Sequence, residues 1–169
     1  MRQGVLIVGF AIVASALAVG SAGAPNHGIS QRAIGGVGLG LTRAGYIHRF
    51  GKPSFTTRFG SGMTRLAYAD RELAIYLSRT GRGIAVLTSA REYRTAAGVG
   101  PCSTISALKK AYPGRLTVTR RSRVVVAYRL RRLLFAAPSG KVGAVMLADA
   151  AFPSSVAVNA GQCGGGEEG

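Results

Sequence analysis

The sequence lacks tryptophan and has few residues of the kinds that most often do chemistry. Its 169 residues include six acidic residues, two histidines and two cysteines. A structural zinc site needs about four ligands, and the only histidines are His27 and His48. We therefore expect no metal-ligating residues and no cofactor.

The shortage of acidic residues weakens any acid–base mechanism, which requires positioned ionisable groups. Outside the C-terminal tail the carboxylates are those of Asp70, Glu72, Glu92 and Asp149. Asp70 and Glu72 flank one arginine in a predicted hairpin turn, which is typical of a solvated turn and not of a catalytic pair.

Motifs for nucleophilic or nucleotide chemistry are also missing. No serine lies in a G-x-S-x-G motif, and the glycine run of residues 35–40 does not match G-x-G-x-x-G. His48 is predicted on the solvent side of a helix, and His27 lies in an N-terminal lead-in. We expect no catalytic residues and no enzymatic activity, with an unrecognised hydrolase as an alternative.

The first 24 residues have the pattern of a secretory signal peptide. After Met1-Arg2-Gln3 comes an uncharged run rich in Val, Ile, Leu and Ala that ends in small residues. We expect residues 1–24 to be a leader and the protein to be secreted or extracytoplasmic, in the cell envelope. The alternative is a retained membrane anchor, since the run is long enough to span a bilayer. Cleavage after Ala22 or after Ala24 stays open.

Two cysteines in an exported chain are expected to form a disulfide. A Cys102–Cys163 bond would close a loop of about 60 residues and would stabilise the fold by about 4 kcal/mol on the chain-entropy model. It would tether the tail, residues 153–169, at Cys163. The alternative is a pair of buried free thiols.

The abundant residue in this chain is arginine. Lysine and arginine number 22 against six acidic residues, for a net charge of +16. This excess indicates an anionic partner such as lipid head groups or a wall polymer, although a GC-rich genome also enriches arginine. The charge is spread along the chain without a basic tail, which argues against nucleic acid.

A repeated pattern indicates internal organisation. Residues 36–52 read GVGLGLTRAGYIHRFGK, and residues 98–114 read GVGPCSTISALKKAYPG. Each predicts a short helix with a threonine N-cap, Thr42 or Thr104. Apolar residues four apart, Tyr46 with Phe50 and Leu108 with Tyr112, would face a core.

Alternating apolar residues after each helix predict three strands, joined near residues 79–82 and 138–141 by short turns. The predicted fold class is α+β, with two tandem units, each a short helix followed by a three-stranded antiparallel sheet. The units are expected at residues 34–97 and 98–152, after a flexible lead-in at 25–33.

Short motifs in the first unit are Val37-Gly38-Leu39-Gly40-Leu41-Thr42 and, at the helix end, Arg49-Phe50-Gly51-Lys52-Pro53; Gly100 to Thr104 and Tyr112-Pro113-Gly114 repeat them in altered form. They resemble the β-lactamase inhibitory protein and the outer-membrane assembly lipoproteins of the SmpA/OmlA type. The resemblance covers residues 34–149 and implies a tandem helix-plus-sheet fold and a protein partner. It assigns no binding residue, and the anchoring cysteine of the lipoproteins is absent.

The stretch from residue 115 to 132 holds seven arginines and no acid. In an extended strand from 121 to 131, alternation would place a positive set on one side and Tyr128 on the core side. That set, the candidate face for an anionic partner, is Arg121, Arg123, Arg129 and Arg131. The alternative is an ordinary solvated sheet face.

Together these observations predict an exported, non-catalytic binding protein whose macromolecular partner is unknown. The partner would be another protein or, alternatively, an anionic lipid or wall polymer of the envelope. A membrane would be involved only through an uncleaved leader. The oligomeric state stays open.

Overall fold

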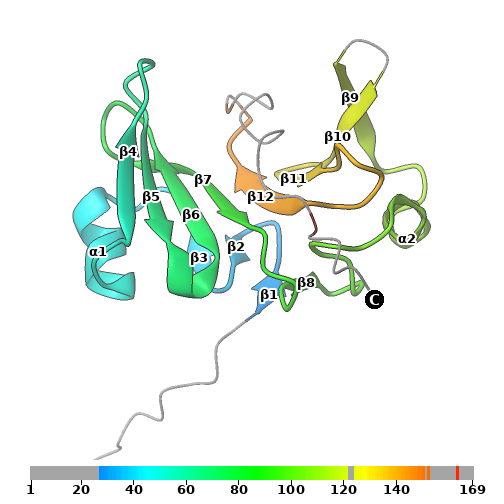
Figure 1. Ribbon diagram of the computed structural model, residues 1–169, viewed down its shortest axis with the longest axis horizontal. Coiled ribbons are helices and arrows are strands. Elements are labelled where there is room, and N and C mark those ends of the chain that lie inside the picture. The colour runs from blue at the N-terminus through cyan, green and yellow to red at the C-terminus, as the bar shows by residue number, and fades with distance from the viewer. Residues whose placement is uncertain (1–26, 122–123, 151, 153–162, 164–169) are drawn as a thin grey trace, which may run out of the picture.

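The chain is mostly β. The computed structural model describes residues 27–121, 124–150, 152 and 163. In these residues two short α-helices accompany a four-stranded sheet and an eight-stranded sheet (Figure 1). Within the same residues, neither helix has the length and apolar character needed to cross a membrane. The predicted leader and most of the predicted tail lie outside the described residues.

The eight-stranded sheet is antiparallel throughout, in the order β4-β5-β6-β7-β12-β11-β10-β9. Its first four strands follow α1, and its last four follow α2. The first set comprises α1 (Arg43–Phe50), β4 (Phe55–Arg58), β5 (Thr64–Tyr68), the 3₁₀ turn η1 (Ala69–Arg71), β6 (Leu73–Leu77) and β7 (Gly83–Thr88). The second set comprises α2 (Ile105–Ala111), β9 (Thr117–Arg121), β10 (Val124–Leu130), β11 (Leu133–Ala136) and β12 (Ala144–Ala148).

The four-stranded sheet is built from two-residue strands in the order β3-β2-β1-β8. These are β1 (Gly28–Ile29), β2 (Ala33–Ile34), β3 (Val37–Gly38) and β8 (Arg94–Thr95). Residues 27–33, expected as a flexible lead-in, instead contain β1 and the start of β2, and Ile29 is buried. The small sheet ties this segment to the stretch that joins the two sets of strands.

The predicted fold class of two tandem units, each a helix with a three-stranded sheet, is wrong. Each helix is followed by four strands, and both sets share one eight-stranded sheet because β7 pairs with β12. Strand β4 was not predicted from the sequence. All four of its residues are exposed, so it has no alternation of apolar and polar residues. Strand β9 is mostly polar and was missed for the same reason.

The helix starts agree with the sequence. Thr42 accepts a hydrogen bond from the Gly45 amide at 3.2 Å, and Thr104 accepts one from Ala107 at 3.1 Å. These bonds satisfy amide groups that a helix leaves unpaired in its first turn. Gly51 follows α1 with a φ of 81°, a conformation that glycine adopts without strain.

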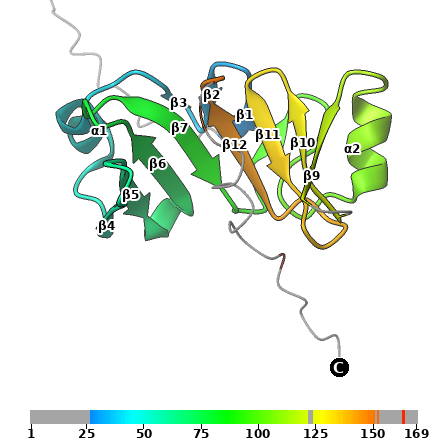
Figure 2. The same cartoon turned by 90° about the horizontal axis from the view of Figure 1, so that it is seen from above.

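One face of the large sheet carries the main core. Strand residues alternate, so Leu73, Ile75 and Leu77 of β6 point to this face, while Ala74 and Tyr76 point to the other. The helices and the small sheet cover the main-core face, with Tyr46 of α1 and Leu108 of α2 fully buried. Figure 2 shows the helices at opposite ends of the long sheet, and β2 contacts both β7 and β12 between them.

The second face of the large sheet is lined mainly by alanine. Tyr76, Leu134 and Met146 add larger side chains to it, and Phe152 packs its ring edge-on against Tyr76 at 5.4 Å between centroids. All of these residues are buried. Both faces of the large sheet are therefore packed, and the chain has two apolar layers instead of one.

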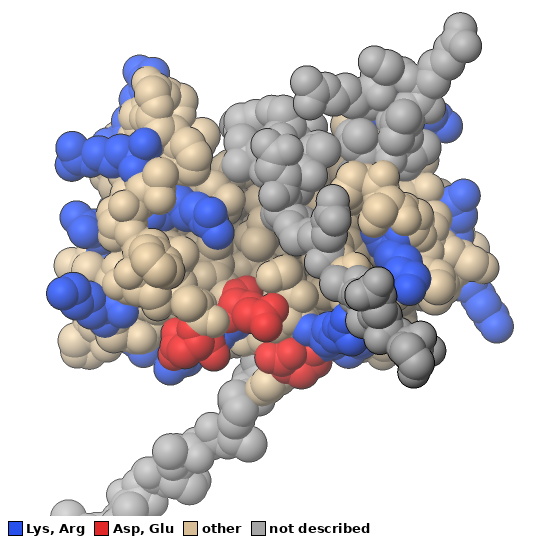
Figure 3. Space-filling model, viewed as in Figure 1, with Lys and Arg blue, Asp and Glu red and all other residues tan. Residues whose placement is uncertain are grey.

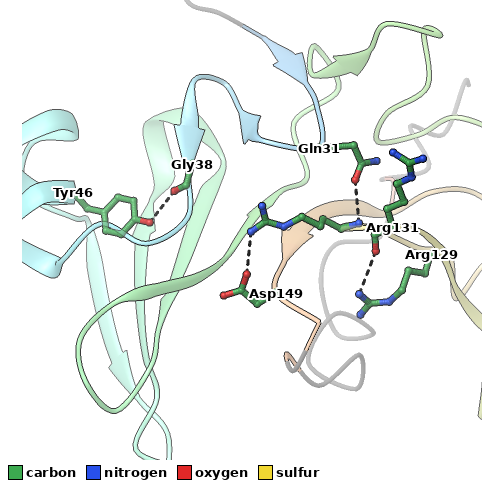
Figure 4. A network of polar contacts seen from close by, with 7 residues as sticks. Gln31, Gly38, Tyr46, Arg129, Arg131 and Asp149 are labelled. Atoms are coloured by element: carbon green, nitrogen blue, oxygen red, sulfur yellow. Dashed lines mark hydrogen bonds and ion pairs between the residues drawn. The ribbon is translucent and has the colours of Figure 1, made fainter.

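Two buried tyrosines differ in the hydrogen bonding of their hydroxyl groups. Tyr46 is fully buried, and its hydroxyl donates to the Gly38 carbonyl at 2.8 Å (Figure 4). Its ring lies against Gly83, where a Cβ would collide with the hydroxyl. Tyr68 is 2% exposed, and its hydroxyl has no hydrogen-bond partner among the described residues.

The predicted disulfide is confirmed. Cys102 and Cys163 are bonded, with their Cα atoms 5.4 Å apart. Cys102 lies just before α2, and its amide donates to the Val142 carbonyl at 2.6 Å. The bond therefore fastens the chain beyond β12 to the entrance of the second helix, and it fits a protein that matures in an oxidising compartment.

Replacing each tyrosine by phenylalanine should separate the two environments. Tyr46→Phe removes the donor to a partly buried carbonyl and should lower the free energy of unfolding by about 1 kcal/mol. Tyr68→Phe removes a hydroxyl buried without a partner and should be neutral or stabilising by up to about 1 kcal/mol. Urea unfolding of both variants measures this, and equal losses would contradict the assignment.

Loss of the disulfide should be costly because it closes a long loop. The double variant Cys102→Ser/Cys163→Ser should lose about 4 kcal/mol of unfolding free energy on the chain-entropy model. Thermal unfolding checks this, with wild type in reductant as the matched reference. Wild type and double variant with the same unfolding midpoint without reductant would show that the bond contributes nothing.

Candidate anion-binding site

The acidic side chains of the first four strands gather at one end of the sheet. In an antiparallel sheet alternate turns lie at opposite ends. Asp70 and Glu72 belong to the turn between β5 and β6, and Glu92 follows β7, so all three lie at the same end. Figure 3 shows the acidic side chains of this view together at one edge, while the rest of the visible described surface carries only lysine and arginine as charged residues.

At the opposite end of the same strands the described charged residues are all basic. It is formed by the β4–β5 loop, the β6–β7 turn and the start of α1, which contribute Arg58, Arg79 and Arg43. The Arg43 amide donates to the Gly81 carbonyl at 3.2 Å, and Thr42 forms an antiparallel bridge with Arg82. These backbone contacts hold the helix start against the β6–β7 turn.

A concavity of about 340 Å³ opens at this basic end. Arg43, Arg58 and Arg79 border it, and Leu77 and Thr64 are among its other lining residues. Thr64 pairs with both Arg58 and Leu77 across the sheet, and directly paired residues share a face. The concavity therefore lies on the face of the large sheet that the helices cover. The described acidic residues are absent from its lining.

A second concavity of about 330 Å³ differs in character. Its lining combines apolar side chains such as Phe55 and Leu87 with one basic residue, Arg65, and one acidic residue, Glu72. Opposite charges in one lining do not select a ligand of either sign. The three-arginine concavity is the stronger candidate for an anionic ligand.

The arginines expected on one strand face are distributed over a hairpin. Arg121 is the last residue of β9, Arg129 lies in β10, and Arg131 lies in the turn after β10 with a φ of 53°. Arg123 lies outside the described residues. The single strand expected from 121 to 131 is therefore wrong, because β9 ends at Arg121 and the antiparallel strand β10 spans Val124–Leu130.

The turn after β10 is held by a polar network (Figure 4). Arg132 forms an ion pair with Asp149 at 2.9 Å, and its amide donates to the Gln31 side chain at 3.0 Å. Gln31 donates in turn to the Leu130 carbonyl at 3.1 Å. These contacts fasten the N-terminal segment to the sheet, so Arg132 has a structural partner.

The histidines do not form an obvious catalytic group. His48 is exposed on α1, as predicted. His27 stacks on Tyr93 with 5.1 Å between ring centroids, and its Nδ1 lies 3.9 Å from a Glu92 oxygen. Among the described residues no cluster of three or more His, Cys, Asp or Glu side chains could hold a metal ion.

Burial changes the acidity of several tyrosines. It raises the pKa of Tyr46, Tyr68, Tyr76 and Tyr93 above the usual value. At Tyr68 the positive charges of Arg43 and Arg71 act in the opposite direction and lower the pKa, although burial outweighs them.

Sequence reasoning missed the concavity because its arginines come from three separate segments. Arg43 opens a helix, Arg58 ends an exposed strand, and Arg79 lies in a turn. Nothing in their spacing indicates that they converge, and the strand that brings Arg58 into position was not predicted. The available signal was only the general excess of arginine.

Comparison with known proteins gives one weak structural similarity. No family model matches the sequence, and no curated protein matches it. A solved structure of an extracellular protein containing an SCP domain, from Bacillus anthracis, is similar with a TM-score of 0.48 and 8% identity. The match covers 66% of this chain and 44% of that one, so this chain matches less than half of that protein. A likeness this weak carries no argument about function.

The raised tyrosine pKa values predict alkaline instability. A folded state that holds its phenolic protons more tightly than the unfolded state keeps this stabilisation below about pH 10 and loses it as the pH rises further. The temperature at the midpoint of thermal unfolding should therefore be lower at about pH 11 than at about pH 9. Absorbance of the phenolate should rise together with unfolding. Ionisation of all tyrosines near their usual pKa, without loss of structure, would contradict this.

Proposed function

We propose that this protein is a non-catalytic binding protein that acts outside the cytoplasm and holds an anionic polymer of the cell envelope. The observation that carries the proposal is the distribution of charge. At one end of the first four strands three arginines border a concavity that contains none of the described acids, and the acids of those strands lie at the other end. A basic end without acids attracts and orients a polyanion.

Two features support a location outside the cytoplasm. The disulfide between Cys102 and Cys163 is of a kind that persists in oxidising compartments. The first 24 residues have the composition of a secretory leader. An arginine-rich domain released into the envelope meets phosphate and carboxylate groups there, which guanidinium groups bind through paired hydrogen bonds.

Two of the described acidic residues have arginine partners in the fold. Asp70 lies 3.6 Å from Arg71, and Asp149 lies 2.9 Å from Arg132. Such partners suit structural ion pairs at the surface. This arrangement supports a binding role over an acid–base reaction.

A protein partner is the second candidate, and one observation favours it. Phe55 is 67% exposed on β4, the edge strand of the large sheet. An exposed aromatic residue beside an unpaired strand edge is a feature of protein interfaces. The test of the polyanion proposal also separates this candidate, because an interface centred on an aromatic residue depends little on salt.

Binding should therefore fall steeply with salt. The protein should be retained on beads carrying a phosphodiester polymer at about 50 mM salt and released by about 500 mM, where charge contacts are screened. Beads carrying a neutral polysaccharide of similar length are the control and should not retain it. Retention that is unchanged at high salt, or equal on neutral beads, would overturn the proposal.

A further inference from the structure

We propose that the concavity bordered by Arg43, Arg58 and Arg79 is a binding site for a phosphoryl group of the anionic partner. This inference rests on the proposed function and deepens it by naming the site and the chemical group it takes. Three guanidinium groups from three separate segments border one concavity of about 340 Å³. Within the described residues none of the three forms an ion pair with an acidic side chain.

The position of Arg43 does not serve the helix that carries it. Arg43 is the first residue of α1, and the first turn of this helix contains no acidic residue. The N-terminus of a helix carries partial positive charge, so a cation there is unfavourable and an anion is favourable. A bound phosphoryl group would offset the repulsion between the Arg43 guanidinium and the partial positive charge of the helix N-terminus.

Arg79 is held in place before any ligand arrives. Its Nε donates to the Ser61 carbonyl at 2.5 Å, a bond that does not use the two terminal nitrogens of the guanidinium. The side chain lies flat against Gly62, where a Cβ would come within 2.7 Å of the Arg79 Cγ. Gly62 also has a φ of 80°. The β4–β5 loop therefore forms a seat for Arg79, and preorganisation of this kind lowers the entropy lost on binding.

The neighbouring arginine in the same turn has a different task. A terminal nitrogen of Arg82 donates to the Gly40 carbonyl at 3.1 Å and so fastens the turn to the segment before α1. Arg82 does not line the concavity. The turn thus uses one arginine for structure and presents the other at the site.

The lining suits a phosphoryl group better than a single carboxylate. Besides the arginines, its lining residues include Thr56 and Thr64, which carry hydroxyl groups. A tetrahedral phosphoryl group offers several oxygens in diverging directions, which match donors arriving from three sides, whereas a planar carboxylate is satisfied by one guanidinium.

The experiment measures binding of glycerol 3-phosphate by calorimetry or by chemical-shift changes, with acetate as the carboxylate probe. The site variant is Arg43→Gln/Arg58→Gln/Arg79→Gln. The matched control, Arg32→Gln/Arg115→Gln/Arg120→Gln, removes the same charge from exposed arginines outside the concavity. The site variant should weaken binding by about tenfold or more, since each lost charge-assisted hydrogen bond contributes that much. The control should stay within about twofold, because distant exposed charges are screened.

A second pair of variants tests the position of Arg79 without changing charge. Gly62→Ala introduces a Cβ against the Arg79 side chain and should weaken glycerol 3-phosphate binding. Gly60→Ala, in the same loop, meets no atom within 4 Å and should leave it unchanged. Thermal unfolding of every variant shows whether the fold is retained. Equal binding by the site variant and its control would overturn the site.

The outcomes distinguish the site from the proposed function. If wild type binds the phosphodiester polymer in a salt-dependent way but both triple variants lose it equally, the function stands and the site is wrong. If wild type binds glycerol 3-phosphate through the three arginines but is not retained by the polymer, the site stands and the function is wrong. Vesicles of phosphatidylglycerol and beads of polyglutamate show whether the phosphoryl group belongs to a lipid and whether carboxylates can replace it.

Discussion

The antiparallel pairing of β7 with β12 joins two sets of four strands that lie far apart in the sequence. Thr88 pairs with Val145 and Ala85 with Ala148, across about sixty residues of chain. Because of this pairing the chain has one continuous eight-stranded sheet, and a single apolar face is long enough to accept both helices and the small sheet. A helix of seven or eight residues is too short to be stable alone, so α1 and α2 depend on that shared face.

The same sheet also places the acids of the first four strands at one end. In an antiparallel sheet successive turns lie at opposite ends of the strands, although their residues are close in sequence. Asp70 and Glu72 thereby lie at one end of the first four strands, and Arg79 lies at the other only a few residues later. The basic concavity is thus a consequence of sheet topology together with turn sequence. Its backbone seat around Gly62 shows that at least one of its arginines is positioned by the fold.

Local signals were sufficient for the helix starts and for most of the inner strands. The hydroxyls of Thr42 and Thr104 cap their helices through contacts within three residues, so neighbouring sequence predicts them well. The alternation of Leu73, Ile75 and Leu77 similarly predicts β6, because one face of that strand is packed against the main core. The disulfide followed from the cysteine count. Fold class failed because the exposed strand β4 carries no such pattern, and because strand order is a property of contacts between distant segments.

The sequence by itself determined the arginine-rich composition, the leader-like start, the two capped helices and several amphipathic strands of this protein. Only the tertiary structure decided that the strands after both helices share one sheet, that β9 and β10 are two antiparallel strands, and that Arg43, Arg58 and Arg79 border the same concavity. The physical reason is the range of the interactions. Caps and alternation act between neighbours along the chain, whereas strand pairing and the meeting of like charges depend on which distant surfaces are buried together.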